Sequence, residues 1–273
     1  MMFSILMSVY KNDRPDYLEI ALSSIYEKQT KKPDEIIIVF DGPLTDDLYR
    51  VIEKFSSDKK DIVKHIKLEK NQGLGQALKI GSENCSHEYI MRMDSDDISD
   101  STRFEKQMLY AENHPSVAVI GAYISEFYNS TNETNMRIRK VPCDLDGIIK
   151  MSKVRNPMNH VTVCIKKSSL FACGGYETLL LLEDYYLWLK MIVAGYDMVN
   201  LPESLVYARI CDGFNTKRSS IERIAGWKVI QNYMIVHKLI NRFAGAMNMV
   251  YIKTFIYLPD KLKQFVYDHI LRS

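Results

Sequence analysis

Residues 89–97, YIMRMDSDD, join a short apolar run directly to a cluster of acids. The first five residues of this stretch are typical of a buried β-strand. Asp94, Asp96 and Asp97 then place three carboxylates within four positions, where they repel one another unless a cation or hydrogen-bond donors offset their charge. Magnesium and manganese take oxygen ligands, and magnesium binds nucleotide phosphates beside one or two carboxylates. The stretch therefore predicts either a metal site at a strand end or a solvated acidic turn that caps the following helix.

Strands and helices alternate on both sides of this stretch. Further apolar runs typical of buried strands lie at residues 3–9, 35–40, 62–68, 117–121, 161–165 and 199–206. Helical spacing of apolar residues fills most of the intervals, for example after Pro15 and after Gly75. This alternation predicts βαβ units and an α/β fold, doubly wound around a mostly parallel sheet. Such sheets bind ligands beyond the carboxyl ends of their strands, where Asp41 and Asp94 stand.

The C-terminal segment differs from the rest of the chain. Residues 219–273 read as helical, with Pro259 between two helical segments, so we expect a main domain over 1–218 and a helical appendage over 219–273. This segment holds eight Lys/Arg and three Asp/Glu, a charge of +5, and the total of +2 leaves −3 for the remainder. A basic tail predicts an anionic partner, either a membrane surface or a nucleic acid.

The bulk composition is that of an ordinary soluble globular protein. A hydrophobic content of 47% with 26% charged residues argues against extensive disorder. The five cysteines show no paired spacing, which favours reduced thiols over a disulfide framework. We expect no signal peptide and no spanning helix, because there is no basic leader and the longest charge-free stretch near the C-terminus is residues 243–252.

The string NQGLG at residues 71–75 partly matches a dinucleotide-binding fingerprint. Leu78 stands where its third glycine belongs, so a nicotinamide dehydrogenase ranks low among the candidate functions. The sequence also holds no phosphate-binding Walker string, no zinc-protease motif, no nucleophile elbow and no kinase motif set. The commonest rival enzyme classes are thereby excluded.

Several polar residues have both a structural and a functional interpretation. Asp41 is either a turn residue or an acceptor for the N–H of a nucleotide base. Asp184, beside Glu183 at a predicted helix start, either caps that helix or acts as a general base. Three further residues are either ordinary structural groups or part of an acceptor or diphosphate site, namely His160, Arg209 and Arg218.

Taken in order, seven strings resemble the family 2 glycosyltransferases with the GT-A fold. They are Met7-Ser8-Val9-Tyr10, Asp41-Gly42, Asn71-Gln72-Gly73 with Ala77, Leu78 and Gly81, Arg92-Met93-Asp94-Ser95-Asp96-Asp97, Arg103 with Gln107, Gly174-Gly175-Tyr176, and Glu183-Asp184. Each string alone identifies the family only weakly, but seven of them in this order over about residues 3–210 are a specific signal. The strings at 156–160, 183–185 and 207–218 resemble bacterial enzymes that extend O-antigen or exopolysaccharide units on a polyprenyl-diphosphate lipid.

The resemblance implies an inverting, metal-dependent hexosyltransferase. Its donor is expected to be a UDP-sugar, with glucose or galactose favoured, and its acceptor GlcNAc-diphosphate-polyprenol, giving a β-linkage. Residues from about 1 to 120 are expected to bind the nucleotide sugar, and those from about 121 to 218 to face the acceptor. The basic, aromatic-rich segment is expected either to bind an anionic membrane surface, and no nucleic acid, or only to pack on the main domain. We favour the membrane, with the chain peripheral on the cytoplasmic face of the cell membrane, because the lipid-linked acceptor that the resemblance implies would require the site to face the bilayer.

The same resemblance implies roles for individual residues. Those expected to bind the nucleotide sugar are Val9, Tyr10, Asp41, Gly73, Arg92 and Asp94, the first three at the base and Asp94 at the ribose. Mn²⁺ or Mg²⁺ is expected on Asp96 and Asp94, and Asp184 is expected to deprotonate the acceptor hydroxyl. Those expected on the acceptor or diphosphate side are His160, Glu183, Arg209 and Arg218.

Two other classes of function stay open. A nucleotide-sugar-binding protein without catalysis would keep Asp41 and Asp94 but would not need Asp184. A nicotinamide dehydrogenase would need the glycine that Leu78 replaces.

Overall fold

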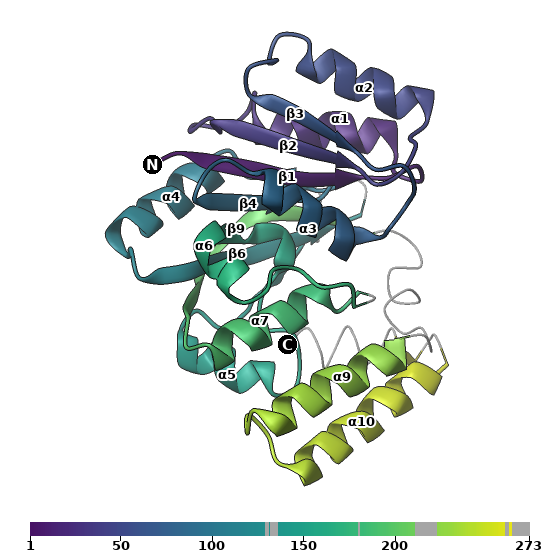
Figure 1. Ribbon diagram of the computed structural model, residues 1–273, viewed down its shortest axis with the longest axis vertical. Coiled ribbons are helices and arrows are strands. Elements are labelled where there is room, and N and C mark those ends of the chain that lie inside the picture. Colours follow the sequence, from purple (N-terminus) through teal and green to yellow (C-terminus); the bar gives the residue numbers. More distant parts are fainter. Residues whose placement is uncertain (129–130, 132–135, 180, 211–222, 260–261, 264–273) are drawn as a thin grey trace.

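One mixed sheet of nine strands runs through the computed structural model, which describes all residues except 129–130, 132–135, 180, 211–222, 260–261 and 264–273 (Figure 1). The strand order is β3-β2-β1-β4-β8-β6-β9-β5, and β7 pairs with β6. The strands are β1 (Phe3–Val9), β2 (Glu35–Phe40), β3 (Val63–Lys67), β4 (Tyr89–Met93), β5 (Ile98–Ser99), β6 (Val117–Phe127), β7 (Arg137–Arg139), β8 (Cys164–Lys166) and β9 (Asp197–Arg209).

The first four strands are parallel to one another. Strand β1 pairs with both β2 and β4, and β2 pairs with β3. The register sets Val9 opposite Phe40 and Met7 opposite Met93, so the carboxyl ends of β1, β2 and β4 meet at one edge. Every residue of β2 and β4 is buried, which explains why both strands are rich in apolar residues apart from Glu35 and Arg92. The expected α/β arrangement of this half is confirmed.

Beyond β4 the sheet has mixed directions. Strand β8 is antiparallel to both β4 and β6, whereas β6 and β9 are parallel to each other. The strand predicted at residues 161–165 begins later than expected, because His160–Thr162 form a 3₁₀ turn, η1, before β8. Thr162 holds this turn through its hydroxyl, which donates to Asn159 O at 2.7 Å and accepts from Ala122 N at 2.9 Å.

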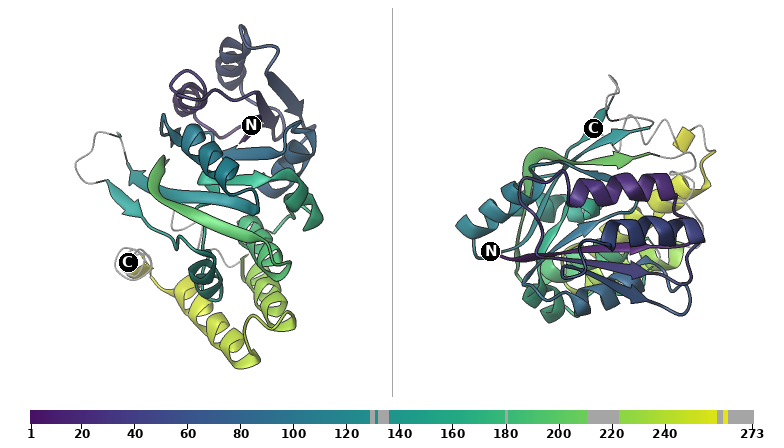
Figure 2. Two further views of the ribbon diagram at one scale, coloured as in Figure 1. Left: turned by 90° about the vertical axis from the view of Figure 1, so that its left-hand side faces the viewer. Right: turned by 90° about the horizontal axis from the view of Figure 1, so that it is seen from above.

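Helices cover both faces of the sheet (Figures 1 and 2). One face packs against α1 (Pro15–Ile25), α2 (Asp46–Ser56) and α4 (Arg103–Asn113). The other packs against α3 (Leu74–Asn84), α5 (Leu145–Ser152), α6 (Lys167–Ala172) and α7 (Glu183–Val193). The sheet is therefore doubly wound, as its sequence predicts.

The C-terminal segment forms a helical hairpin at the end of the molecule away from α2 and β3 (Figure 1). Helices α9 (Arg223–Val236) and α10 (Arg242–Tyr257) are joined by a turn in which Lys238 has a φ of 59°. The sequence predicted a break only at Pro259, so this earlier turn was missed. Two α9 side chains, Ile230 and Met234, pack on α7. The predicted boundary at 218/219 lies outside the described residues, and no helix within them is long and apolar enough to cross a membrane.

Candidate active site

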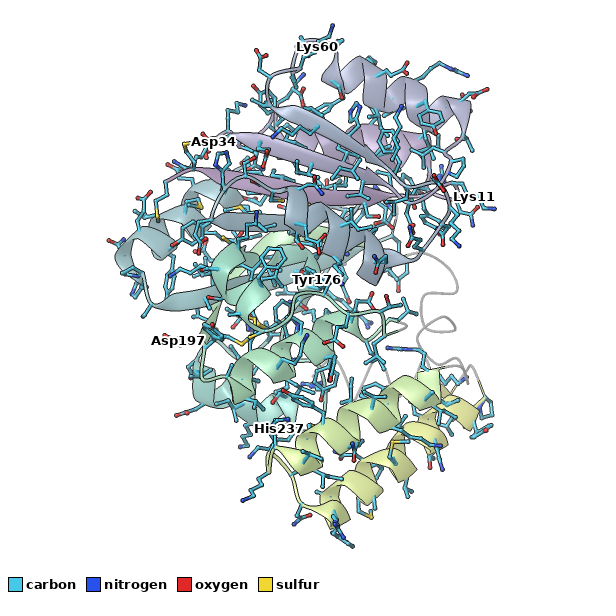
Figure 3. All side chains as sticks on the ribbon, viewed as in Figure 1. Lys11, Asp34, Lys60, Tyr176, Asp197 and His237 are labelled. Carbon is cyan, nitrogen blue, oxygen red and sulfur yellow. The ribbon has the colours of Figure 1, made fainter. Side chains whose placement is uncertain are left out.

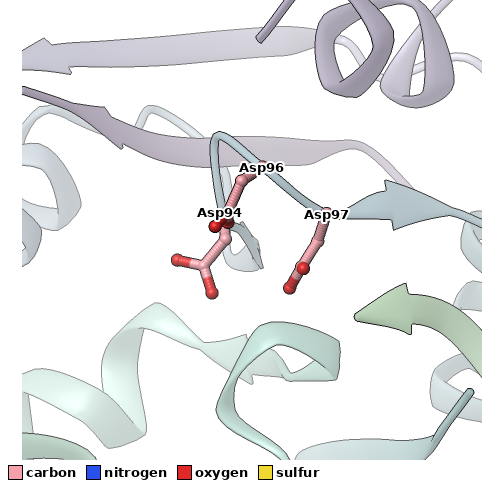
Figure 4. A group of neighbouring side chains, drawn as sticks. All are labelled: Asp94, Asp96 and Asp97. Carbon is pink, nitrogen blue, oxygen red and sulfur yellow. The ribbon is translucent and has the colours of Figure 1, made fainter. Parts of the chain in front are cut away.

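The turn after β4 gathers the three acids singled out in the sequence. One carboxylate oxygen from each of Asp94, Asp96 and Asp97 lies within 4.8 Å of the others (Figure 4). Burial, followed by the charges of Asp94 and Asp13, raises the pKa of Asp96 to about 6. Burial and the neighbouring carboxylates also hold the pKa of Asp97 well above its usual range. Such crowding of oxygen ligands fits a divalent cation, whose charge would relieve the repulsion.

Two buried arginines lie directly behind these acids. The Arg92 guanidinium pairs with Asp94, and this ion pair outweighs the burial that opposes the charged form and raises the pKa of Arg92. Arg103 donates to Arg92 O at 2.8 Å and to Gln107 Oε1 at 3.0 Å. Gln107 in turn donates to the carbonyl oxygens of Ile120 and Thr162. Arg103 and Gln107 therefore fix the end of β4 against β6 and η1.

Arg209 supports the acidic turn from the end of β9. Its backbone N–H donates to Asp97 Oδ1 at 2.8 Å, and its Nε donates to Asp96 O at 3.1 Å. Its guanidinium lies 3.8 Å from the ring centroid of Tyr17 and 4.5 Å from that of Phe127. These contacts brace the acidic turn, and the predicted place of Arg209 on the acceptor or diphosphate side stays a prediction. Arg218 lies outside the described residues.

Asp41 closes the loop at residues 71–73 onto the end of β2. Its carboxylate accepts hydrogen bonds from Gln72 N at 2.7 Å, Gly73 N at 3.0 Å and Asn71 Nδ2 at 3.0 Å. Gly42 allows this approach, because it has a φ of 86° and a Cβ there would lie 2.6 Å from Asn71 N. The loop that the sequence singled out thus meets the end of β2, with Gly73 leading into α3.

A further carboxylate, Asp13, links the end of β1 to the acidic turn. Asp13 Oδ2 accepts from Tyr10 N at 3.1 Å and from the Ser95 hydroxyl at 2.8 Å. Burial and the charges of Asp13 and Asp96 raise the pKa of Tyr10. The sequence analysis did not place Asp13 at this edge, and helix α1 begins after Arg14 without a side-chain cap. Val9, Tyr10, Asp41 and Asp94 therefore meet at one strand-end edge, as predicted.

A second set of side chains lies around the start of α7 and is called the second wall of the site. Its members are Asn156, His160, Tyr176, Glu183 and Asp184. Asp184 lies in its first turn, and its Oδ2 accepts a hydrogen bond of 2.6 Å from Asn156 Nδ2. His160 Nε2 lies 3.0 Å from the Tyr176 hydroxyl oxygen. Tyr176 is buried in the cluster that includes Leu6 of β1 and Leu187 of α7 (Figure 3). The wall therefore joins Asp184 and His160, which the sequence named, to Asn156 and Tyr176.

Arg92 connects the two walls electrostatically. Burial and the Arg92 charge hold the pKa of His160 well below its usual range, so its ring is neutral near pH 7. Burial, then Asp184, raises the pKa of Glu183 to about 7, while Arg92 opposes this rise. The Arg92 guanidinium that pairs with Asp94 thus lowers the pKa of His160 and limits the rise in the pKa of Glu183, the residue before Asp184. The acidic turn after β4 and the start of α7 therefore both lie within electrostatic reach of the Arg92 guanidinium.

Residues 4–179 match the family model described as glycosyl transferase family 2. The amylovoran biosynthesis glycosyltransferase AmsE of Erwinia amylovora is 35% identical to this chain over 98% of both chains. An Escherichia coli UDP-Gal:alpha-D-GlcNAc-diphosphoundecaprenol beta-1,3-galactosyltransferase is 34% identical over 99% of this chain and 96% of its own. Among solved structures, S. aureus TarS 1-349 in complex with UDP-GlcNAc superposes with a TM-score of 0.69 at 17% identity, covering 99% of this chain and 76% of that one.

The raised pKa of Glu183 gives a pH-dependent prediction of stability. Between its ordinary value of 4.5 and about 7 the folded state holds a proton that the unfolded state releases, so stability falls as pH rises through this window. The substitution Glu183→Gln should therefore stabilise the protein at about pH 8, by up to about 3 kcal/mol, and much less at about pH 5. Thermal unfolding at both pH values measures this, with the exposed Glu53→Gln as control. An equal gain at both pH values would contradict it.

Proposed function

The chain belongs to glycosyl transferase family 2 and has the predicted GT-A fold, and we propose that it is an inverting, metal-dependent hexosyltransferase. The proposed donor is UDP-glucose or UDP-galactose, and the proposed acceptor is GlcNAc-diphosphate-polyprenol in O-antigen or exopolysaccharide synthesis. One observation carries this proposal. The Arg92 guanidinium pairs with Asp94 in the acidic turn and also acts electrostatically on Glu183, which is next to Asp184 at the start of α7. The near full-length similarity to an E. coli enzyme named for UDP-Gal and GlcNAc-diphosphoundecaprenol supports the choice of substrates.

We assign the nucleotide of the donor to the ends of the parallel strands. Val9, Tyr10 and Asp41 would hold the base, and Asp94 the ribose. A carboxylate has about four acceptor positions. Asp41 uses three of them on the loop at residues 71–73, which leaves one for a base N–H. Gly73 and Arg92 complete the proposed nucleotide-sugar side.

The cofactor is proposed to be Mn²⁺ or Mg²⁺ on Asp96 and Asp94. Crowded, partly buried carboxylates are suitable ligands for such hard cations. When bound, the ion would supply a Lewis acid that stabilises the charge growing on the leaving diphosphate. Asp97 is committed to Arg209 N, so its proposed part is to hold the shape of the turn.

Asp184 is proposed as the general base. It takes the proton of the acceptor hydroxyl while that oxygen forms a bond with the anomeric carbon of the donor sugar. The bond from this carbon to the diphosphate oxygen breaks on the opposite face, and the nucleoside diphosphate leaves with the electron pair. Because the hydroxyl attacks from the face opposite the departing diphosphate, an α-linked donor gives a β-linked product. His160 and Glu183 would line the acceptor side of this step.

The alternative of a nucleotide-sugar-binding protein without catalysis does not account for the second wall. Such a protein needs the strand-end edge but no oriented carboxylate opposite it. Asn156 holds the Asp184 carboxylate through a hydrogen bond, and the Arg92 charge lowers the pKa of His160 on the same wall. This organisation around a carboxylate favours catalysis. The family match leaves no support for a nicotinamide dehydrogenase.

Turnover should depend on a divalent cation and on the donor sugar. We expect the purified protein to consume UDP-glucose or UDP-galactose faster than their N-acetyl forms, in the presence of a GlcNAc-diphosphate-lipid acceptor and Mn²⁺ or Mg²⁺. EDTA should abolish turnover, and excess metal should restore it. Activity that persists in EDTA would exclude the metal, and an α-linked product by NMR would exclude the inverting mechanism.

Loss of the base should separate catalysis from binding. The variant Asp184→Asn should lose about 10²–10⁴-fold in kcat, because proton transfer by a positioned base contributes that much. Binding of UDP, measured by calorimetry, should stay near the wild-type value, since the donor lies on the other wall. Asp144→Asn, which alters a carboxylate that caps α5, serves as a control for the charge change. Unchanged kcat in Asp184→Asn would remove Asp184 from this role.

We also propose that the α9–α10 hairpin places the protein on an anionic membrane surface on the cytoplasmic side. Residues 223–259 hold five Lys/Arg and no Asp or Glu. Exposed apolar side chains accompany this charge on α10, where Phe243 is 76% and Tyr251 and Tyr257 are each 66% exposed. Basic and aromatic residues on helices that do not span are typical of an interfacial segment. A lipid-linked acceptor would require such contact.

Binding to vesicles should depend on the charge of this hairpin. Replacing Lys238, Arg242 and Lys253 with Gln should weaken binding to phosphatidylglycerol vesicles by about 10²-fold at low salt, since each basic residue contributes roughly 1 kcal/mol. The control replaces Lys28, Lys60 and Lys79, three lysines outside the hairpin; Lys60 and His237 mark opposite ends of the molecule (Figure 3). Equal binding by both triple variants would show that the hairpin only packs against α7.

A further inference from the structure

Asn156 holds the carboxylate of Asp184 in place, and no motif in the sequence assigned it a role. We propose that Asn156 is the positioning residue for the general base, an inference that rests on the proposed function of Asp184. Its Nδ2 donates to Asp184 Oδ2 at 2.6 Å, and it is the only hydrogen-bond partner of the Asp184 side chain within the described residues. The bond joins the loop after α5 to the first turn of α7.

The orientation of the Asn156 amide is fixed by its second hydrogen bond. Its Oδ1 accepts from Met158 N at 3.1 Å, a local turn that asparagine favours. With the oxygen held there, the NH₂ group must point to Asp184. The side chain therefore presents a donor, and not an acceptor, to the carboxylate.

The loop that carries Asn156 is anchored on three sides. Asn159 Nδ2 donates to Ala122 O at 2.9 Å, and Asn200 Nδ2 donates to Pro157 O at 3.3 Å. The Tyr185 hydroxyl donates to Ser152 O at 2.6 Å, just before the loop. Because β6, β9 and α7 all hold this loop, Asn156 is a fixed point against which the carboxylate is oriented.

A neutral donor suits the orientation of a base. An amide occupies Oδ2 without bringing the positive charge that a lysine or arginine would bring. Oδ1 then remains as the oxygen that faces the acceptor hydroxyl. Displacing a catalytic group by about 1 Å costs on the order of 10²-fold in rate. The contact is therefore expected to act on turnover more than on binding.

The sharpest variant is Asn156→Asp. It keeps an oxygen for Met158 N but replaces the donor with a carboxylate that repels Asp184. We expect kcat to fall by about 10–10²-fold, with the KM for the UDP-sugar and the binding of UDP near wild type. Asn156→Ala, which removes the donor without adding charge, should show the same loss of kcat. It provides a second measurement if the Asp variant folds poorly.

The matched control is Tyr185→Phe. It removes the other side-chain hydrogen bond between the same two segments, without touching Asp184. We expect a lower Tm with kcat within about twofold of wild type, because a single buried hydrogen bond contributes about 1 kcal/mol to stability. A purely structural role for Asn156 would make its variants resemble this control.

A double-mutant cycle tests whether Asn156 acts through Asp184. Once Asp184→Asn has removed the base, adding Asn156→Ala should lower kcat no further, whereas independent effects would multiply. Loss of activity in Asp184→Asn with kcat retained in both Asn156 variants overturns the positioning role alone. Full activity in Asp184→Asn overturns the assignment of the base, and with it this inference.

Discussion

The repulsion among the three carboxylates after β4 is the constraint on which the rest of the site depends. Contacts within the protein itself act against it. Arg92 pairs with Asp94, and Arg209 N donates to Asp97. These contacts leave the pKa of Asp96 raised to about 6, so part of the repulsion persists. A strand end that keeps this much uncompensated charge is suited to a divalent cation.

This turn holds its shape because its supports come from distant parts of the sheet. Arg103 and Gln107, one turn apart on α4, hydrogen-bond to the backbones of β4, β6 and η1. Burial lowers the pKa of Arg103 to about 9, which shows how costly a buried guanidinium is without a carboxylate partner. The Arg92 carbonyl oxygen and the Gln107 side chain accept hydrogen bonds from that guanidinium, so it draws on no carboxylate of the acidic turn for a hydrogen bond.

The sequence predicted the first half of the fold well, and contacts between distant residues explain where it failed. Strands β1, β2 and β4 are short runs dominated by apolar residues, so their burial and their ends could be predicted directly from the sequence. The turn η1 could not, because it depends on Thr162 bonding to Ala122, forty residues away. Asp13, Asn156 and the bracing role of Arg209 were missed for the same reason. Their partners lie 82, 28 and 112 residues away in sequence.

The two walls of the site differ in how far neighbouring donors and cations offset the charge of their carboxylates. The strand-end wall crowds carboxylates beyond what its own donors offset, which suits a cation and a diphosphate. The α7 wall gives Asp184 a neutral amide, and it keeps His160 neutral beside Arg92. A cation on the second wall would stabilise the ionised carboxylate and weaken it as a base. In the proposed mechanism, keeping the positive charge on the strand-end wall would let one site stabilise a leaving diphosphate and still accept a proton from an attacking hydroxyl.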